Sequence, residues 1–293
     1  MTSSIIVKLI IGALMIGAVY SVLGMSYSLI YKATGLMNLA QGDFLMLGAY
    51  VGLTFVKTLK LGIVPSFILT FVVMFVIGYI TERYLITLLL KRGSSFSYII
   101  LCTAALSMAF ENGVQQVWSP YTIQFPAVFK SISVDFLGTK VAPENLLVLC
   151  IAIFSALFLF FFLNKTKYGT AMRASAQDQV AAGALGINVQ LTKGITWGLS
   201  AGLAGILGMA LGPVYGVYST MGAMIAQKSF AGAVTGGYGN IYGAVIGGMF
   251  YGFLETFTSA FLTTTYKDVI TFVVLIIVLI VAPTGIFNEK VIE

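Results

Sequence analysis

Long stretches without a charged side chain constrain this protein more than any other feature of its sequence. Residues of Asp, Glu, Lys and Arg are absent from six runs of 20 residues or more, namely Leu9–Tyr31, Leu61–Thr81, Asn145–Asn164, Gly194–Gln227, Ser229–Leu254 and Val269–Asn288. A helix of about 20 apolar residues crosses the roughly 30 Å hydrocarbon core of a bilayer. Only 9% of the residues are charged, against roughly 25% in a soluble domain. Solid apolar runs without alternation exclude a β-barrel and predict an all-α polytopic membrane protein.

We predict about eight transmembrane helices in one domain that covers residues 1–293. The expected spans are Leu9–Tyr31, Leu36–Val56, Leu61–Thr81, Ser97–Val117, Asn145–Leu163, Gly194–Leu211, Ile241–Phe261 and Val269–Phe287. The first run is too long for a cleaved signal peptide, so it is expected to stay as a span. The stretch from Pro213 to Gly239 is apolar but rich in glycine. We expect it to be a re-entrant segment or a broken helix.

Composition excludes several kinds of chemistry. The sequence has no histidine, so the usual proton shuttle and the commonest metal ligand are absent. Cys102 and Cys150 lie in apolar surroundings and are expected to act as small hydrophobes. The net charge of +6 is spread thinly, which excludes a nucleic-acid partner. No phosphate-binding loop is present. We therefore expect no metal, no cofactor and no enzymatic activity, and any ATP-driven work needs another chain.

The orientation follows from the short connections that collect Lys and Arg, because such loops stay in the cytoplasm. Two connections qualify, and their basic residues are Arg83, Lys91 and Arg92 in the first and Lys165, Lys167, Arg173 and Lys193 in the second. The connection Ser119–Glu144 balances its basic residues with acidic ones. We expect it to face outward, which by parity also puts the N-terminus outside.

An internal repeat is visible at an offset of 186 residues. The segment from Ala40 to Phe44 reads AQGDF, and the segment from Ala226 to Phe230 reads AQKSF. Five predicted spans lie between the two copies, and this odd number gives the halves opposite orientations. Inverted repeats are typical of transporters that bind their substrate near the midplane at discontinuous helices. Chance similarity among Ala-rich and Gly-rich helices is the alternative interpretation.

Few polar side chains interrupt the apolar runs, and each must face the bundle interior or water. The repeat places five of them in corresponding segments, and we predict that these line the passage: Asn38, Gln41, Asp43, Gln227 and Ser229. The alternative for the first copy is a simple cytoplasmic turn before the second span. Glu111 and Glu255 lie near predicted span ends, where carboxylates are expected to extend to the interface.

Glycine recurs at helical spacing in the sixth and seventh predicted spans. Small residues let membrane helices approach closely where no hydrophobic gain drives them together. The sixth span places its glycines on one face, and the seventh repeats the Gly-x-x-x-Gly pattern, so we expect a helix-packing role for Gly198, Gly202, Gly205, Gly243 and Gly247.

The predicted cytoplasmic connection of residues 164–193 is long for a structureless loop, and long loops are usually functional. Asp178 can cap a short amphipathic helix that Gly186 would end. An apolar face on a cytoplasmic helix suits docking into another protein, whereas a helix lying in the headgroup plane is the alternative. The residues expected to form this coupling element are Arg173, Asp178, Ala181, Ala182, Leu185 and Gly186.

Four segments together resemble a known family. The segment from Gly35 to Tyr50, GLMNLAQGDFLMLGAY, strongly resembles the opening segment in membrane subunits of branched-chain amino-acid ABC importers. MRASAQD from Met172 to Asp178, GGYGN from Gly236 to Asn240 and PTGIF from Pro283 to Phe287 resemble later motifs of that family. The match runs from about Leu9 to Phe287 in the right order. Gln41, where many members have His, departs from the pattern, and so does Ala282, where Arg is common.

This resemblance implies one membrane subunit of an importer in the bacterial cytoplasmic membrane. Such an importer contains a second homologous permease, two cytoplasmic ATPase subunits and an extracytoplasmic substrate-binding protein. Leucine, isoleucine and valine are the leading substrates, while urea, short amides, other amino acids and nucleosides use similar permeases. A transporter or channel that works alone, with Asp43 or Glu255 coupled to an ion, is the alternative from another class.

The outward connection offers a docking surface for the substrate-binding protein that the resemblance implies. Large aromatic side chains dominate many protein interfaces. Four of them lie in or beside this connection, and we expect them to anchor the binding protein: Trp118, Tyr121, Phe125 and Phe129.

Overall fold

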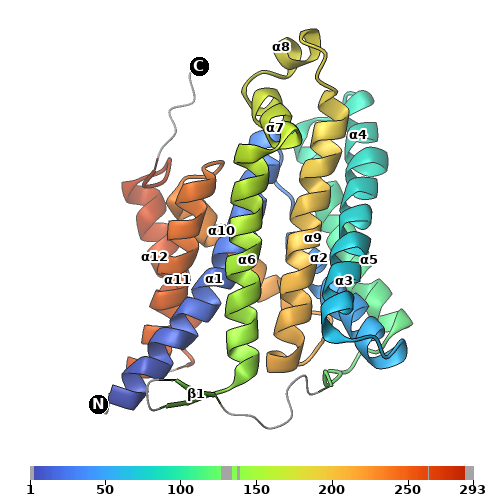
Figure 1. The fold of residues 1–293 in the computed structure, drawn as a ribbon. Helices are drawn as coiled ribbons and strands as arrows, with labels where there is room; N and C mark the ends of the chain where they lie inside the picture. Colours follow the sequence, from blue (N-terminus) through green and yellow to red (C-terminus); the bar gives the residue numbers. More distant parts are fainter. Residues whose placement is uncertain (1–2, 127–133, 137–138, 263, 288–293) are drawn as a thin grey trace.

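The computed structural model describes residues 3–126, 134–136, 139–262 and 264–287. Its elements are nearly all helices that run up and down one bundle (Figure 1). In chain order they are α1 (Ser3–Thr34), α2 (Gln41–Leu53), the π-helix η1 (Thr54–Thr58), α3 (Ile63–Ile80), the π-helix η2 (Thr81–Ile86), α4 (Thr87–Lys91), α5 (Phe96–Val117), β1 (Val134–Phe136), β2 (Thr139–Val141), α6 (Pro143–Lys165), α7 (Lys167–Gln177), α8 (Gln179–Ala184), α9 (Val189–Tyr215), α10 (Met221–Gly236), α11 (Ile241–Phe261) and α12 (Lys267–Val281). The two strands form one antiparallel hairpin outside the bundle. The all-α prediction is confirmed.

The predicted count of eight spans is not confirmed by the helix lengths. By length and composition, five helices of the described residues qualify as candidate spans: Ile5–Thr34, Ile63–Lys91, Phe96–Val117, Pro143–Lys165 and Val189–Tyr215. The predicted span Leu36–Val56 is helical only from Gln41 onward. The Gly-rich stretch contains a helix of its own, α10, which follows residues 216–220 without helical structure. Breaks of this kind shorten a helix below the length that crosses a bilayer.

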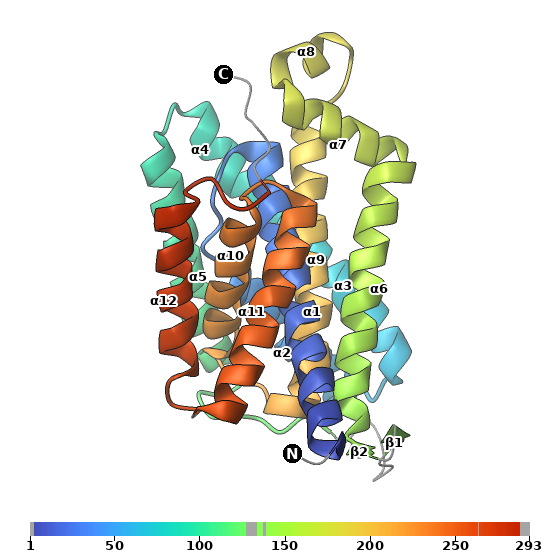
Figure 2. The ribbon, with the colours of Figure 1, turned by 90° about the vertical axis from the view of Figure 1, so that its left-hand side faces the viewer.

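The two ends of the bundle carry different connections. The N-terminal end of α1, strands β1 and β2 and residues 118–126 after α5 lie at one end, whereas α4, α7 and α8 lie at the other (Figure 2). The predicted inner connections therefore share one face, and the predicted outer connection lies on the opposite one. Because α10 reverses the chain once more, α12 ends on the face that carries α7 and α8.

Helix packing has the symmetry that an inverted repeat requires. Helix α1 packs most extensively on α11, and its counterpart α9 packs on α3; likewise α1 contacts α10 and α9 contacts α2. Helices α1 and α9 run in opposite directions through the bundle (Figure 1). The two short helices α2 and α10 begin at Gln41 and Met221, 180 positions apart. At the sequence offset of 186, the long helices α1 and α9 therefore correspond, whereas the starts of the short helices α2 and α10 do not.

Glycine permits the closest helix contacts. Gly198 and Gly202 face the rings of Phe75 and Phe71 on α3, and a Cβ on either glycine would lie about 3 Å from them. On α9, Gly205 packs against Gly48 of α2. The α10–α11 contact pairs two glycines of each helix, Gly236 and Gly232 of α10 with Gly243 and Gly247 of α11. These positions bring backbones together as small-residue faces do in membranes.

Candidate functional site

A cavity of about 420 Å³ lies where the two short helices begin. Helices α2 and α10 cross at Gly42 and Gly222, whose backbones touch. Residues 37–39 and 219–220 precede the two helices and line the cavity, and α5 closes its side. The amino ends of two helices, one from each half of the repeat, thus converge on the cavity. Helix amino ends carry partial positive charge and unpaired N–H groups that favour polar ligands.

Three of the five predicted passage residues line this cavity, namely Asn38, Asp43 and Gln227. Asp43 lies in the first turn of α2, where the helix dipole favours a carboxylate. Glu111 on α5 also lines the cavity. It points inward, whereas the sequence analysis expected it at the membrane interface.

The other two predicted passage residues do not face the cavity. Gln41 is fully buried, where its Nε2 donates to the carbonyl oxygen of Ser200 at 3.3 Å and its Oε1 accepts from Ser200 Oγ at 3.2 Å. The same Oε1 accepts from Asn38 Nδ2 at 3.2 Å. Ser229 is fully buried too, and its hydroxyl donates to the carbonyl oxygen of Ile225 at 2.7 Å. Gln41 therefore fastens the turn before α2 to α9 and is not part of the cavity wall.

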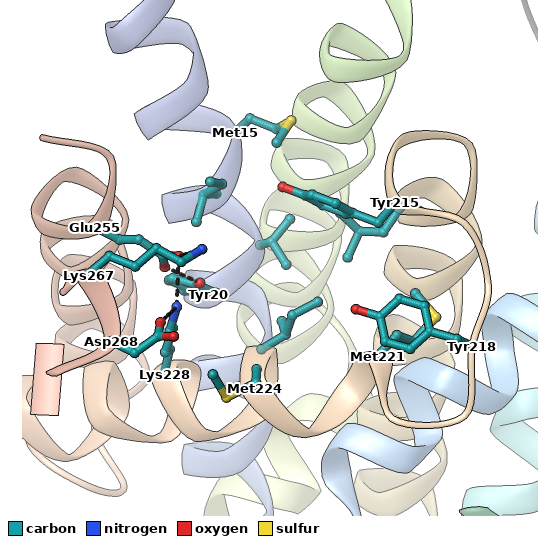
Figure 3. A pocket seen from close by; sticks show the side chains of 14 residues that line it. Met15, Tyr20, Tyr215, Tyr218, Met221, Met224, Lys228, Glu255, Lys267 and Asp268 are labelled. Atoms are coloured by element: carbon teal, nitrogen blue, oxygen red, sulfur yellow. Dashed lines mark hydrogen bonds and ion pairs between the residues drawn. The ribbon is translucent and has the colours of Figure 1, made fainter. Parts of the chain in front are cut away.

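A second cavity, of about 310 Å³, has charged groups on one wall (Figure 3). Lys228 of α10 is buried, and its Nζ lies 2.7 Å from Glu255 Oε1 and 2.6 Å from Asp268 Oδ1. Lys267 Nζ lies 3.1 Å from the same Glu255 oxygen, and the hydroxyl of Tyr20 donates to Glu255 Oε2 at 2.5 Å. The expectation that Glu255 extends to the interface is wrong, because two lysines and a tyrosine hold it inside.

The sequence patterns did not predict Lys228, Lys267 and Asp268 as members of this cluster. One signal could have found the first of them. Lys228 is the single charged residue between the uncharged runs Gly194–Gln227 and Ser229–Leu254, and an isolated lysine at such a position needs a buried partner. Within the described residues, no group of three or more Cys, Asp or Glu side chains could hold a metal ion.

The predicted coupling element forms two helices, α7 and α8, at one end of the bundle (Figure 2). The Asp178 carboxylate caps α8 by accepting from the N–H groups of Val180 at 2.8 Å and Ala181 at 3.0 Å. Gly186 ends the turn with a φ of +85°, a conformation that glycine adopts at little cost. Leu185 is 82% exposed.

Two residues of the predicted coupling element contact the chain itself and are not directed toward a partner. Ala182 is only 3% exposed, so it packs within the chain and offers nothing to a partner groove. Arg173 donates from Nη1 to Asn164 Oδ1 at 3.2 Å, which ties α7 to the end of α6. Gln179 further links α8 to the bundle, since it donates to the carbonyl oxygen of Ala33 at 3.4 Å and accepts from Lys193 Nζ at 2.8 Å.

Comparison with known proteins identifies the family. The family described as the permease component of the branched-chain amino acid transport system matches residues 9–279. The chain belongs to this permease family. Its members are membrane subunits of transport systems, which agrees with the multi-pass helical bundle.

Individual relatives support the same assignment. The permease is 31% identical over 243 residues to the probable branched-chain amino acid transport permease protein LivH of Methanocaldococcus jannaschii, covering 78% of this chain and 74% of the relative. It is 29% identical to the high-affinity branched-chain amino acid transport system permease protein LivH of Escherichia coli strain K12, covering 77% of each chain. The fold is similar to a chain of PsaBC from Streptococcus pneumoniae, solved in complex with a Fab, with a TM-score of 0.52, 13% identity and coverage of 93% and 91%.

The outer connection of the permease offers fewer exposed anchors than its sequence suggests. Tyr121 is 79% exposed, but Phe125 is buried against Gly212 of α9. Trp118 donates from Nε1 to Thr54 Oγ1 at 2.8 Å and packs near the ring of Tyr50. Phe129 lies outside the described residues. Two of the four predicted anchors thus hold the connection to the bundle.

Proposed function

We propose that this permease forms half of the membrane pathway of an ATP-driven importer for leucine, isoleucine and valine in a bacterial cytoplasmic membrane. The observation that carries the proposal is the cavity where the amino ends of α2 and α10 converge between the two inverted halves. The relatives named LivH are permeases of branched-chain amino acid transport, which supports this substrate class. A second copy or a homologous permease would supply the other half of the pathway.

The pathway in this proposal follows the α2–α10 cavity. Asn38, Asp43 and Gln227 would contact the passing solute because they line the cavity. Gln41 would act as a positioning residue, since its hydrogen bonds to Ser200 hold the turn that carries Asn38. Ser229 lies behind the wall, where its backbone oxygen packs against Gly24 of α1.

Energy would reach the pathway through α7 and α8. The sequence contains no phosphate-binding loop, so two separate ATPase subunits would bind and hydrolyse ATP. The exposed side chains of Val180, Ala181 and Leu185 would enter a groove on one ATPase subunit. Asp178 and Gly186 shape this helix, while Gln179 and Lys193 connect it to the ends of α1 and α9. A movement of the ATPase would therefore act directly on both long helices.

Purification in mild detergent from the native host tests the proposal. We expect the permease to copurify with an ATPase that contains a phosphate-binding loop, and reconstituted vesicles to take up leucine only with ATP and an extracytoplasmic binding protein. Uptake that needs no ATPase and follows an ion gradient would contradict the proposal. That result would favour a transporter that works alone.

A further inference from the structure

The charged cavity lies apart from the α2–α10 pathway cavity and has no role in the function proposed above. Its charges come from three helices: Lys228 from α10, Glu255 from α11, and Lys267 with Asp268 from the first turn of α12. That turn of α12 lies at the end of the bundle that holds the N-terminus (Figure 2). In the predicted orientation, the cavity therefore belongs to the outer half of the permease.

The four charges differ in their access to the cavity. The side chains of Lys228 and Glu255 are 4% and 7% exposed, and they form a closed pair that Tyr20 also supports. Lys267 and Asp268 are 36% and 30% exposed at their side chains. The buried Lys228–Glu255 pair therefore lies behind the partly exposed Lys267 ammonium and Asp268 carboxylate, although the Asp268 Oδ1 that faces Lys228 is itself buried.

The rest of the cavity wall is mainly apolar. Methionine and aliphatic side chains from α1, α9 and α10 line the rest of the cavity, including Met15, Leu211, Met221 and Ile225. Met15 and Met221 lie away from the charged cluster (Figure 3). Tyr215 and Met224 also line the cavity and are 49% and 46% exposed, which places them at its open side, the rim. The site combines one cationic group, one anionic group and an apolar surface within about 310 Å³.

We propose that this cavity binds the zwitterion of a free aliphatic amino acid on the outer side of the permease. Lys267 would bind the α-carboxylate, Asp268 would bind the α-ammonium group, and the methionine wall would contact the side chain. The substrate class rests on the function proposed above. The solute would bind in this cavity before it moves to the α2–α10 cavity.

Charge balance explains why a zwitterion fits better than other solutes. On binding, Lys267 would exchange Glu255 for the ligand carboxylate, and Asp268 would turn from Lys228 to the ligand ammonium group. The Lys228–Glu255 pair stays intact, so every buried charge keeps a partner. A simple anion would engage only Lys267 and a simple cation only Asp268, so either would form just one of the two ion pairs that a zwitterion forms. A neutral solute such as urea offers no charge to replace either ion pair.

Protection from alkylation tests the site directly. In a Cys102→Ser, Cys150→Ser background, Tyr215→Cys places one thiol at the rim, and the purified importer is labelled with N-ethylmaleimide. We expect leucine to slow labelling about tenfold when its concentration is about ten times its Kd, because only unoccupied protein reacts. Two isosteres of leucine that lack one charge each, 4-methylpentanoate and 3-methylbutylamine, should give no protection. Met224→Cys serves as a second reporter if Tyr215→Cys impairs assembly.

Variants of the two exposed charges provide the matched comparison. Lys267→Met with Asp268→Asn keeps the buried Lys228–Glu255 pair, so we expect the protein to assemble but to lose protection by leucine. Lys60→Met removes an exposed lysine outside the cavity, and this control variant should still be protected by leucine. Equal protection by leucine and both isosteres would show an unselective apolar pocket and overturn the proposal. Absence of protection in an importer that still takes up leucine would overturn this site and leave the proposed function standing.

Discussion

At the residue scale, Gln41 shows how a residue can serve a pathway without lining it. Its amide makes three hydrogen bonds, two to Ser200 and one to Asn38, while it is fully shielded from solvent. A buried polar group left without its partner costs about 1–3 kcal/mol. The side chain therefore contributes to stability as well as to the shape of the turn before α2.

We predict different outcomes for Gln41→Leu and Gln227→Leu. Gln41→Leu should lower the Tm of the purified permease and reduce uptake, because it breaks the bonds to Ser200. Gln227→Leu should reduce uptake at an unchanged Tm, because Gln227 lines the cavity. Thermal unfolding and leucine uptake of the two variants, measured side by side, check this. Normal uptake in both would remove the cavity from the pathway.

The sequence predicted which two segments meet better than it predicted where their side chains point. The AQGDF and AQKSF segments do lie near each other at the helix crossing, yet of Gln41 and Asp43 only the latter faces the cavity. A shift of two positions moves a side chain about 200° around a helix. The sequence could not supply that angle, because it depends on where each short helix starts, and tertiary packing decides the start.

At the element scale, the crossing of α2 and α10 depends on two glycines. A Cβ at Gly42 would lie 2.6 Å from the carbonyl oxygen of Gly222, and a Cβ at Gly222 would overlap the backbone of Gly42. Backbone atoms cannot move aside as a flexible side chain can. The amino ends of the two helices therefore converge only because neither crossing residue has a side chain.

We predict that Gly222→Ala destabilises the permease by about 1–3 kcal/mol, the usual range for overpacking. Gly113→Ala is the matched control, because Gly113 lies within α5 and a Cβ there meets nothing within 4 Å. The control should be neutral or slightly stabilising, since alanine favours helix by about 1 kcal/mol over glycine. Unfolding in detergent measures both variants. Equal effects would show that the crossing tolerates a methyl group.

Helix α8 and the residue after it differ sharply in exposure from one position to the next. Ala182 is 3% exposed and Leu185 is 82% exposed, so a charge at Ala182 would break the chain's own packing. We predict that Leu185→Glu leaves the permease stable but releases the ATPase or uncouples hydrolysis from uptake, because a charge buried against a partner without a counterion costs several kcal/mol. Copurification of the ATPase and uptake by vesicles check this.

Two controls accompany the α8 variant. Lys165→Ala, at the end of α6, should keep both ATPase association and uptake. Ala182→Glu should instead lower the Tm before any effect on coupling can be measured. If Leu185→Glu retained the ATPase and full uptake, α8 would not be the coupling element, and a position in the headgroup plane would explain its apolar residues better.

At the scale of the whole molecule, charge and topology agree on which connections share a face. Helix α4, which ends at Lys91 and lies between Arg83 and Arg92 in the chain, is at the same end as α7 and α8, opposite strands β1 and β2 (Figure 2). The sequence predicted this division from charge alone. The charge pattern does not fix the side of the C-terminus, because the Gly-rich stretch Pro213–Gly239 holds a single charged residue, Lys228, and residues 216–220 precede its helix α10 without helical structure. Only the packing of α10 against α11 shows that the chain turns there.

Labelling from each side can test the orientation of the bundle in the membrane. In a Cys102→Ser, Cys150→Ser background, we expect a membrane-impermeant maleimide to label Tyr121→Cys on intact cells and Leu185→Cys only on inverted vesicles. Both positions are more than three-quarters exposed at opposite ends of the bundle, so accessibility depends on sidedness and not on burial. The physical reason is the excess of Lys and Arg on the α7–α8 face, which favours retention in the cytoplasm. The reverse labelling pattern would place α7 and α8 outside, where they could meet no cytoplasmic ATPase, and would contradict the coupling proposal together with the orientation.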